Sequence, residues 1–175
     1  MSRGRRRLVA GLAVVAVAIL GLATLRADRA DRLPPGEATV TRTVDGDTVD
    51  VLVAGGDERV RLLGIDAPES VDPRRPVECY GKEAAARTAA LLPAGTRVRL
   101  ERDVEARDRY GRLLAHVYRV ADGVHVNLTL VVEGYADTLT IAPNSAHAAE
   151  LAAAARSARS ARSGLWGSCP AQGGR

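Results

Sequence analysis

The stretch RVRLLGIDAPES, residues 59–70, gathers side chains that could do chemistry. Its first half alternates polar and apolar residues, as a half-buried strand does, and carries Arg61. A short loop then holds Asp66 and Glu69. Two carboxylates this close repel each other and gain little from burial. We therefore expect a cation between them.

A second acidic stretch, VDGDTVDV at residues 44–51, precedes this strand. Its Asp-Gly dipeptide is common in hairpins, so a plain turn is the simplest interpretation. An EF-hand loop is excluded, because it would need an acid or amide at Val49 and a glycine at Asp50. Asp47 could still join Asp66 and a backbone carbonyl of the DAPE loop as oxygen ligands of calcium.

A third stretch, DRYGRLLAHVY at residues 108–118, supplies Arg109, Tyr110 and Arg112 ahead of a strand. A turn with solvated arginines is the simple alternative. A guanidinium held at the start of a strand is suited to bidentate contact with phosphate. The tyrosine ring could pack on a sugar or a base.

The elements that must position these residues are short. Strands are predicted at residues 38–44, 48–53, 59–63, 96–101 and 113–120, and helices at 81–92, 126–133 and 144–163. Five strands interrupted and followed by helices indicate an α+β domain. A small five-stranded barrel is the natural way to close so few strands.

The first 30 residues are predicted to be a leader. A cluster of arginines precedes an apolar run of 18 residues, 8–25, which is just long enough to span a bilayer. The rest of the chain should then be exported. No small-x-small cleavage site follows, which favours an uncleaved membrane anchor facing outside over a cleaved signal peptide and secretion. Residues 31–36, DRLPPG, are predicted to be a linker, 37–168 the domain and 169–175 a tail.

The net charge of +4 does not indicate a polyanionic partner. It comes from the arginines of the leader, and the rest of the chain is close to neutral. Only the placement of single arginines can therefore point to nucleic acid.

The two cysteines, Cys79 and Cys169, fit an exported chain, in which an even count commonly means a disulfide. The bridge would tie the GLWGSCP tail to the loop before the first helix. Two separate thiols are the alternative, and two cysteines are too few for a structural zinc site.

The histidines carry little signal in the sequence. His147 and Glu150 have the i, i+3 spacing that can bind a metal on a helix, although an exposed pair is the simpler interpretation. His116 is expected in a strand and His125 beside a turn.

In order and spacing, these stretches resemble the staphylococcal-nuclease (thermonuclease) family. The matching pieces are VDGDTVDV, RVRLLGIDAPE, YGKEA, DRYGRLLAHVY and VNLTLVVEGYA, with GLWG near the end. The resemblance implies an OB-fold barrel with three helices. It also implies a calcium-dependent phosphodiesterase that cuts DNA and RNA.

The resemblance extends to individual positions. It implies that calcium is bound by Asp47, Asp66 and the carbonyl of Ala67. It also implies three catalytic residues: Arg61, Glu69 and Arg112. The glutamate would orient or deprotonate the attacking water, and the arginines would hold the phosphate and stabilise transition-state charge.

One stretch departs from the family pattern. ADTLTIAPN, residues 136–144, has Leu139 and Ile141 where the best-known member has two tyrosines that stack on the nucleotide, so altered affinity or base preference is expected. A non-catalytic OB-fold module that binds nucleic acid or protein is the alternative function. The presence of all the acids and arginines named above favours the enzyme, which we expect to act as a monomer.

Overall fold

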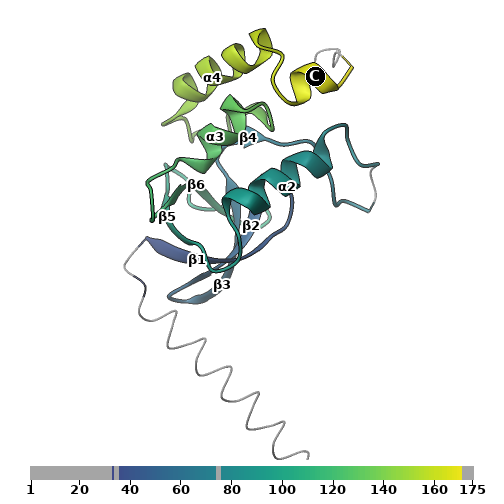
Figure 1. Ribbon diagram of the computed structural model, residues 1–175. Helices are drawn as coiled ribbons and strands as arrows, with labels where there is room; N and C mark the ends of the chain where they lie inside the picture. The colour runs from purple at the N-terminus through teal and green to yellow at the C-terminus, as the bar shows by residue number, and fades with distance from the viewer. Residues whose placement is uncertain (1–32, 34–35, 74–75, 171–175) are drawn as a thin grey trace, which may run out of the picture.

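The computed structural model describes residues 33, 36–73 and 76–170 (Figure 1). Seven strands and four helices are assigned in this part of the chain. In order they are β1 Glu37–Thr43, β2 Thr48–Val53, β3 Gly56–Leu62, β4 Gly64–Asp66, α2 Gly81–Leu91, β5 Arg97–Glu101, β6 Leu113–Arg119, α3 Val126–Val132, β7 Asp137–Leu139, α4 Ala148–Ser160 and α5 Leu165–Ser168.

Five strands close into a barrel in the order β1-β2-β3-β6-β5, with β5 pairing back onto β1. All neighbours are antiparallel except β3 and β6. A parallel pair needs a long crossover connection, and here the chain passes through β4, α2 and β5 between these two strands. The α+β class and the five-stranded barrel are confirmed.

The core is built almost wholly from aliphatic side chains, because the chain has no phenylalanine. Inward residues of the barrel strands are 0–1% exposed: Ala38, Val40, Val49, Val51, Val60, Leu62, Val98, Ala115 and Val117. In β1 the burial alternates along the strand, which matches the pattern expected of a sheet with one face buried.

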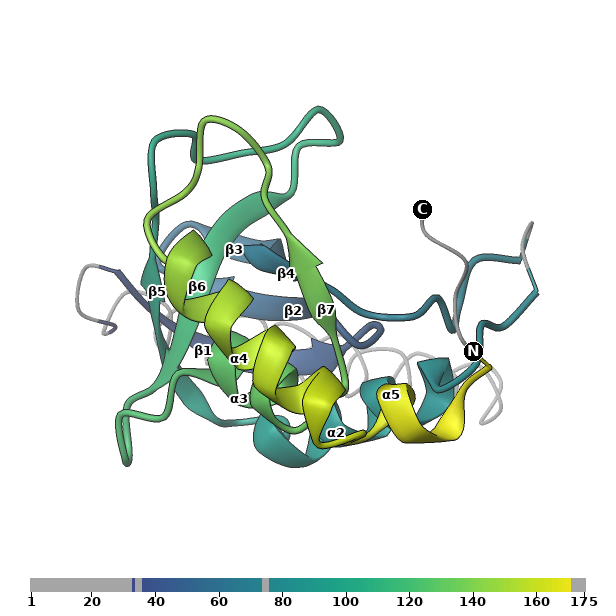
Figure 2. The ribbon, with the colours of Figure 1, turned by 90° about the horizontal axis from the view of Figure 1, so that it is seen from above.

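Helices cover the barrel on more than one side. Figures 1 and 2 show α2 running along the barrel and α4 lying over α3. Leu151 and Ala155 of α4 are buried in the same core cluster as Leu130 of α3. A disulfide joins Cys79, before α2, to Cys169, after α5.

Three short elements were not predicted from the sequence, namely β4, β7 and α5. Strands of three residues are too short to show a period of two, so their pattern carries no signal. β4 and β7 pair with each other as a separate two-stranded sheet. This small sheet is important for the site, because Asp66 is its last residue on β4.

The prediction for the last helix was wrong at its start. The helix begins at Ala148 rather than near Asn144, because the backbone of the preceding residues is engaged elsewhere. The Asp103 carboxylate accepts the N–H groups of Ser145 and Ala146 at 2.6 and 2.8 Å. Asn144 Oδ1 accepts the N–H of Glu105 at 2.8 Å.

Among the described residues, none of the helices combines the length and the apolar character needed to cross a bilayer. The predicted leader, residues 1–30, and most of the predicted linker, 31–36, lie outside the described residues. The anchor and the cleaved signal therefore stay predictions.

Candidate active site

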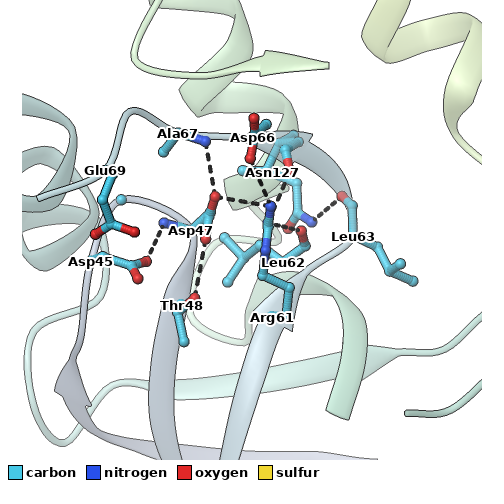
Figure 3. Close-up of polar contacts among 12 residues, drawn as sticks. Asp45, Asp47, Thr48, Arg61, Leu62, Leu63, Asp66, Ala67, Glu69 and Asn127 are labelled. Atoms are coloured by element: carbon cyan, nitrogen blue, oxygen red, sulfur yellow. Dashed lines mark hydrogen bonds and ion pairs between the residues drawn. The ribbon is translucent and has the colours of Figure 1, made fainter. Parts of the chain in front are cut away.

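The site begins with a buried carboxylate, that of Asp47, which is 7% exposed (Figure 3). Asp47 Oδ2 lies 3.0 Å from Arg61 Nη2 and accepts the N–H of Ala67 at 2.9 Å. Asp47 Oδ1 accepts the hydroxyl of Thr48 at 3.1 Å. Asp47 is thereby tied both to the barrel and to the loop that follows β4.

Burial raises the pKa of the Asp47 carboxyl to about 7, although Arg61 beside it acts in the opposite direction. Desolvation disfavours the charged form, and one shared guanidinium does not fully offset it. The site would therefore be stabilised by additional positive charge near Asp47.

The turn that carries Asp47 is fixed from both sides. A Cβ at Gly46 would come within 2.5 Å of the Ala67 Cβ and 2.9 Å of the Ala84 Cβ, so only glycine fits between the loop and α2. The Gly46 carbonyl accepts the hydroxyl of Thr88 at 2.7 Å, and Thr88 is fully buried in α2. The polar residue on the buried face of this helix thus holds the turn in place.

Asp66, on β4 of the small β4–β7 sheet, lies next to Asp47 and Arg61. Its Oδ1 accepts a hydrogen bond from Arg61 Nη2 at 3.2 Å, so both acids lie within 3.2 Å of one nitrogen. Its side chain is 46% exposed, in contrast to that of Asp47. The cluster therefore has a buried side and a side open to solvent.

A buried asparagine supports the turn between β3 and β4. Asn127, at the start of α3, donates to the Leu63 carbonyl at 2.8 Å and accepts the N–H of Val117 at 2.9 Å. It is fully buried, and each of these contacts satisfies a backbone group that would otherwise be costly to bury. Asn127 and the role of Thr88 were not predicted from the sequence. The signal available for both was a polar residue on a helix face that is otherwise apolar.

Arg61 is 5% exposed, which is rare for an arginine, and it is fully engaged by the protein at both terminal nitrogens. Nη1 donates to the carbonyls of Leu62 and Ile65 at 2.9 and 2.8 Å, and Nη2 serves the two aspartates. The structure thus gives Arg61 a clear positioning role for Asp47 and Asp66.

Glu69 lies in the loop after Asp66, where its carboxylate accepts three consecutive backbone N–H groups. Oε1 is 2.8, 2.8 and 3.0 Å from the nitrogens of Ser70, Val71 and Asp72. These bonds, that of Val71 above all, hold the pKa of the Glu69 carboxyl below its ordinary value. Glu69 is therefore ionised at neutral pH and oriented by its own loop.

Arg112 and Tyr110 line a groove on the outer surface of the barrel. The groove runs over the outer face of β1, β2 and β3 and is lined by Thr41, Arg42, Asp50, Asp57, Glu58, Arg59, Tyr110, Gly111 and Arg112. Arg112 Nε donates to Asp108 Oδ2 at 2.7 Å, which leaves its terminal nitrogens to face a ligand. Among the described contacts, none links Arg112 to the Asp47 cluster.

Tyr110 is 68% exposed and carries the side chain of Arg109, whose guanidinium carbon lies 4.8 Å from the ring centroid. Arg109 also donates to the tyrosine hydroxyl at 2.6 Å. An exposed aromatic ring flanked by cations is the kind of surface on which a nucleotide base stacks.

A second groove opens beside Asp66 and Ala67. It is lined by Asp66, Ala67, Pro68, Glu78, Asp137, Thr138, Leu139, Arg159, Leu165 and Trp166. Its floor includes the only tryptophan of the chain, with the Arg159 guanidinium carbon 4.4 Å from the Trp166 ring centroid. Trp166 and Arg159 were not predicted from the sequence to lie at the site. A single tryptophan in a chain so poor in aromatic residues was the available signal.

The donor set around Asp47 fits a hard divalent cation. Two carboxylates converge there, and the oxygen ligands available are those of Asp47, Asp66 and the backbone beside Ala67. One guanidinium serves both acids, so the cluster retains negative charge, which is consistent with the raised pKa of Asp47.

The known proteins that this chain resembles are nucleases. Residues 59–168 match the family described as staphylococcal nuclease homologue. A thermonuclease of Staphylococcus intermedius is 45% identical over 108 residues, which are 62% of this chain and 62% of that protein. A thermonuclease of Staphylococcus hyicus is 42% identical over 105 residues, 60% of each chain. Endonuclease YncB of Bacillus subtilis (strain 168) is 43% identical over 99 residues, 56% of this chain and 46% of that protein. The matched region thus spans less than two thirds of each of these relatives.

Proposed function

Because the chain belongs to the staphylococcal nuclease homologue family, we propose that it is a calcium-dependent nuclease that hydrolyses phosphodiester bonds of DNA and RNA. Similar proteins are named thermonuclease and endonuclease. The observation that carries the proposal is the convergence of Asp47 and Asp66 on one nitrogen of Arg61, next to the loop of Glu69.

Asp47, Asp66 and the carbonyl of Ala67 would hold the calcium ion. When bound, the ion supplies Lewis-acid polarisation of a phosphate oxygen and neutralises charge. The raised pKa of Asp47 supports this assignment, because a buried carboxylate with too little positive charge nearby gains most from a cation.

The remaining residues act on the water and on the phosphate. Glu69 accepts a hydrogen bond from the attacking water and orients it. Its lowered pKa keeps it ionised but makes it a weak base, so orientation contributes more than strong proton abstraction. Arg112, whose Nε donates to Asp108, binds the phosphate oxygens through its terminal nitrogens, and Arg61, which lies against Asp47 and Asp66, adds positive charge.

The two grooves flanking the site offer a path for a nucleotide chain. Tyr110 with Arg109 offers a stacking surface on one side, and Trp166 with Arg159 lies on the other. Leu139, on β7, lines the second groove and offers apolar contact to a base. We therefore infer weak base selectivity on both DNA and RNA.

Digestion of plasmid DNA and of single-stranded RNA by the full chain tests this function. We expect cleavage of both with calcium and loss of cleavage with excess chelator. Full cleavage in chelator would overturn the metal assignment. Binding of nucleic acid without any cleavage in calcium would instead identify a non-catalytic OB-fold module.

We further propose that the domain acts outside the cell, held to the membrane by the apolar run at residues 8–25. The disulfide between Cys79 and Cys169 supports an oxidising compartment. Fractionation of cells that express the full chain tests this: most of the protein should sediment with membranes. Recovery mainly from the medium, with a new N-terminus after the apolar run, would indicate a cleaved signal.

A further inference from the structure

All three histidines of the chain meet at one place, although they come from different elements. His116 is in β6, His125 directly precedes α3, and His147 directly precedes α4. The ring centroids of His116 and His147 are 4.3 Å apart, and those of His125 and His147 are 5.1 Å apart. Only His116 of the three is buried, and its ring nitrogens need polar partners there.

Two carboxylates complete the cluster. His147 Nδ1 lies 3.2 Å from Glu150 Oε2, and His147 Nε2 lies 3.0 Å from Glu101 Oε1. One ligand atom each from His125, His147 and Glu150 can be chosen so that all three lie within 4.8 Å of one another. Ligands about 2.1 Å from a tetrahedral zinc ion are about 3.4 Å apart, so shifts on the order of 1 Å would bring these atoms to coordinating distance.

Neighbouring groups already orient the ring of His125. The Tyr118 ring stacks on it at 4.4 Å with an interplanar angle of 15°. His125 Nε2 lies 3.3 Å from His116 Nδ1, so the buried His116 can fix the orientation of its neighbour. At metal sites in proteins, a ligating imidazole is usually oriented by a partner that contacts its other ring nitrogen.

We propose that His125, His147 and Glu150 form a transition-metal site, with zinc as the fitting ion, separate from the oxygen-only site at Asp47 and Asp66. Two imidazoles and a carboxylate suit zinc, whereas calcium takes oxygen ligands. The fourth position is filled by water, and Glu101, which lies 3.0 Å from His147 Nε2, orients the His147 ring through the nitrogen that does not face Glu150. Because the ligands come from the starts of α3 and α4, the ion would fasten these two helices together and stabilise the fold. The proposal does not depend on the proposed hydrolysis.

Calorimetric titration of the full chain with zinc, in buffer containing calcium, tests the proposal. We expect one zinc per chain and a higher unfolding temperature with zinc. The variants His125→Ala and Glu150→Gln should each weaken binding by about ten-fold or more and lose the zinc-dependent shift. Glu105→Gln, a change at an exposed glutamate outside the cluster, should bind as the wild type does.

Glu150→Gln changes an exposed side chain and keeps its size, so it tests the site even if His125→Ala does not fold. Absence of zinc binding to the wild-type chain would overturn the proposal. So would undiminished binding in both variants. Zinc binding that is lost in Asp66→Asn but kept in His125→Ala would place the ion at the oxygen site and would equally overturn it.

Discussion

At the level of single residues, Glu69 combines full ionisation with a fixed orientation, since three backbone N–H groups of its own loop bind one carboxylate oxygen. Its other oxygen can accept a hydrogen bond from water. In the function we propose, the Glu69 side chain contributes to catalysis chiefly through its charge and position.

Replacement of this residue gives the first prediction. Glu69→Gln keeps an oxygen that can accept the loop N–H groups but removes the charge, so kcat for plasmid cleavage should fall by about 10²–10⁴-fold. The unfolding temperature should change little. Initial rates and thermal unfolding of the variant measure both. Glu105→Gln is the matched control and should cleave at the wild-type rate; a Glu69→Gln rate close to that of the control would exclude a catalytic role.

Arg61 illustrates how a residue in this fold can carry two roles. The family resemblance implies that it contacts the phosphate, but in the structure its terminal nitrogens bind two carbonyls and two carboxylates. Removal of one partner of a buried ion pair leaves an uncompensated charge, at a cost of about 3–5 kcal/mol. Loss of activity in an Arg61 variant would thus mix catalysis with stability, and for this reason Glu69 is the cleaner test.

At the level of elements, the position of Asp47 depends on the close approach of its turn to the Ala67 loop and α2. Gly46→Ala should lower calcium-dependent activity, because the new methyl group would meet the Ala67 Cβ at 2.5 Å and push the two acids apart. Gly55→Ala is the matched control, since a Cβ there meets nothing within 4 Å. Cleavage rates at limiting calcium compare the two variants. Equal rates would show that the spacing of the turn and loop does not matter.

A second element-scale feature is the cross-strand ladder Arg42–Asp50–Arg59 on β1, β2 and β3. Asp50 accepts from Arg59 Nε at 2.7 Å and from Arg42 Nη2 at 2.5 Å. These contacts, that of Arg59 first, hold the pKa of the Asp50 carboxyl below its ordinary value of 3.8.

The sign of the resulting pH dependence follows from linkage. A carboxyl whose pKa is lower in the folded state stabilises the fold above pH 3.8, and this contribution is lost as the pH falls below that value. Asp50→Asn should therefore lower the free energy of unfolding by about 1 kcal/mol at neutral pH, since both arginines are largely exposed. The difference should shrink when urea unfolding is repeated below pH 3.8. A difference independent of pH would contradict the ladder.

The predictability of the fold from sequence varied by element. The barrel strands and the start of α2 were predictable because alternation and turn residues mark them. The sheet of β4 and β7 was not, because pairing between residues 64–66 and 137–139 is a long-range event with no local pattern. The convergence of the three histidines was hidden for the same reason, whereas Asp47, Asp66 and Arg61 could be grouped by resemblance.

At the level of the whole molecule, the disulfide closes a long loop. Cys79 and Cys169 are 90 residues apart, and a crosslink over such a distance is expected to contribute about 4.6 kcal/mol through the unfolded state. The Cys79→Ser/Cys169→Ser double variant should unfold at a lower urea concentration than the oxidised wild type. Reduced wild type serves as the control and should match the variant. Equal stability of oxidised and reduced wild type would show that the bridge does not stabilise the domain.

The central claim is that Asp47 and Asp66 together hold the ion on which cleavage depends. The most direct measurement is the initial rate of plasmid cleavage against free calcium for the wild type and for Asp66→Asn, a change at a half-exposed side chain. We predict saturation for the wild type and a calcium requirement raised by about ten-fold or more in the variant, because one charged ligand is lost. The same calcium dependence in both proteins would contradict the account.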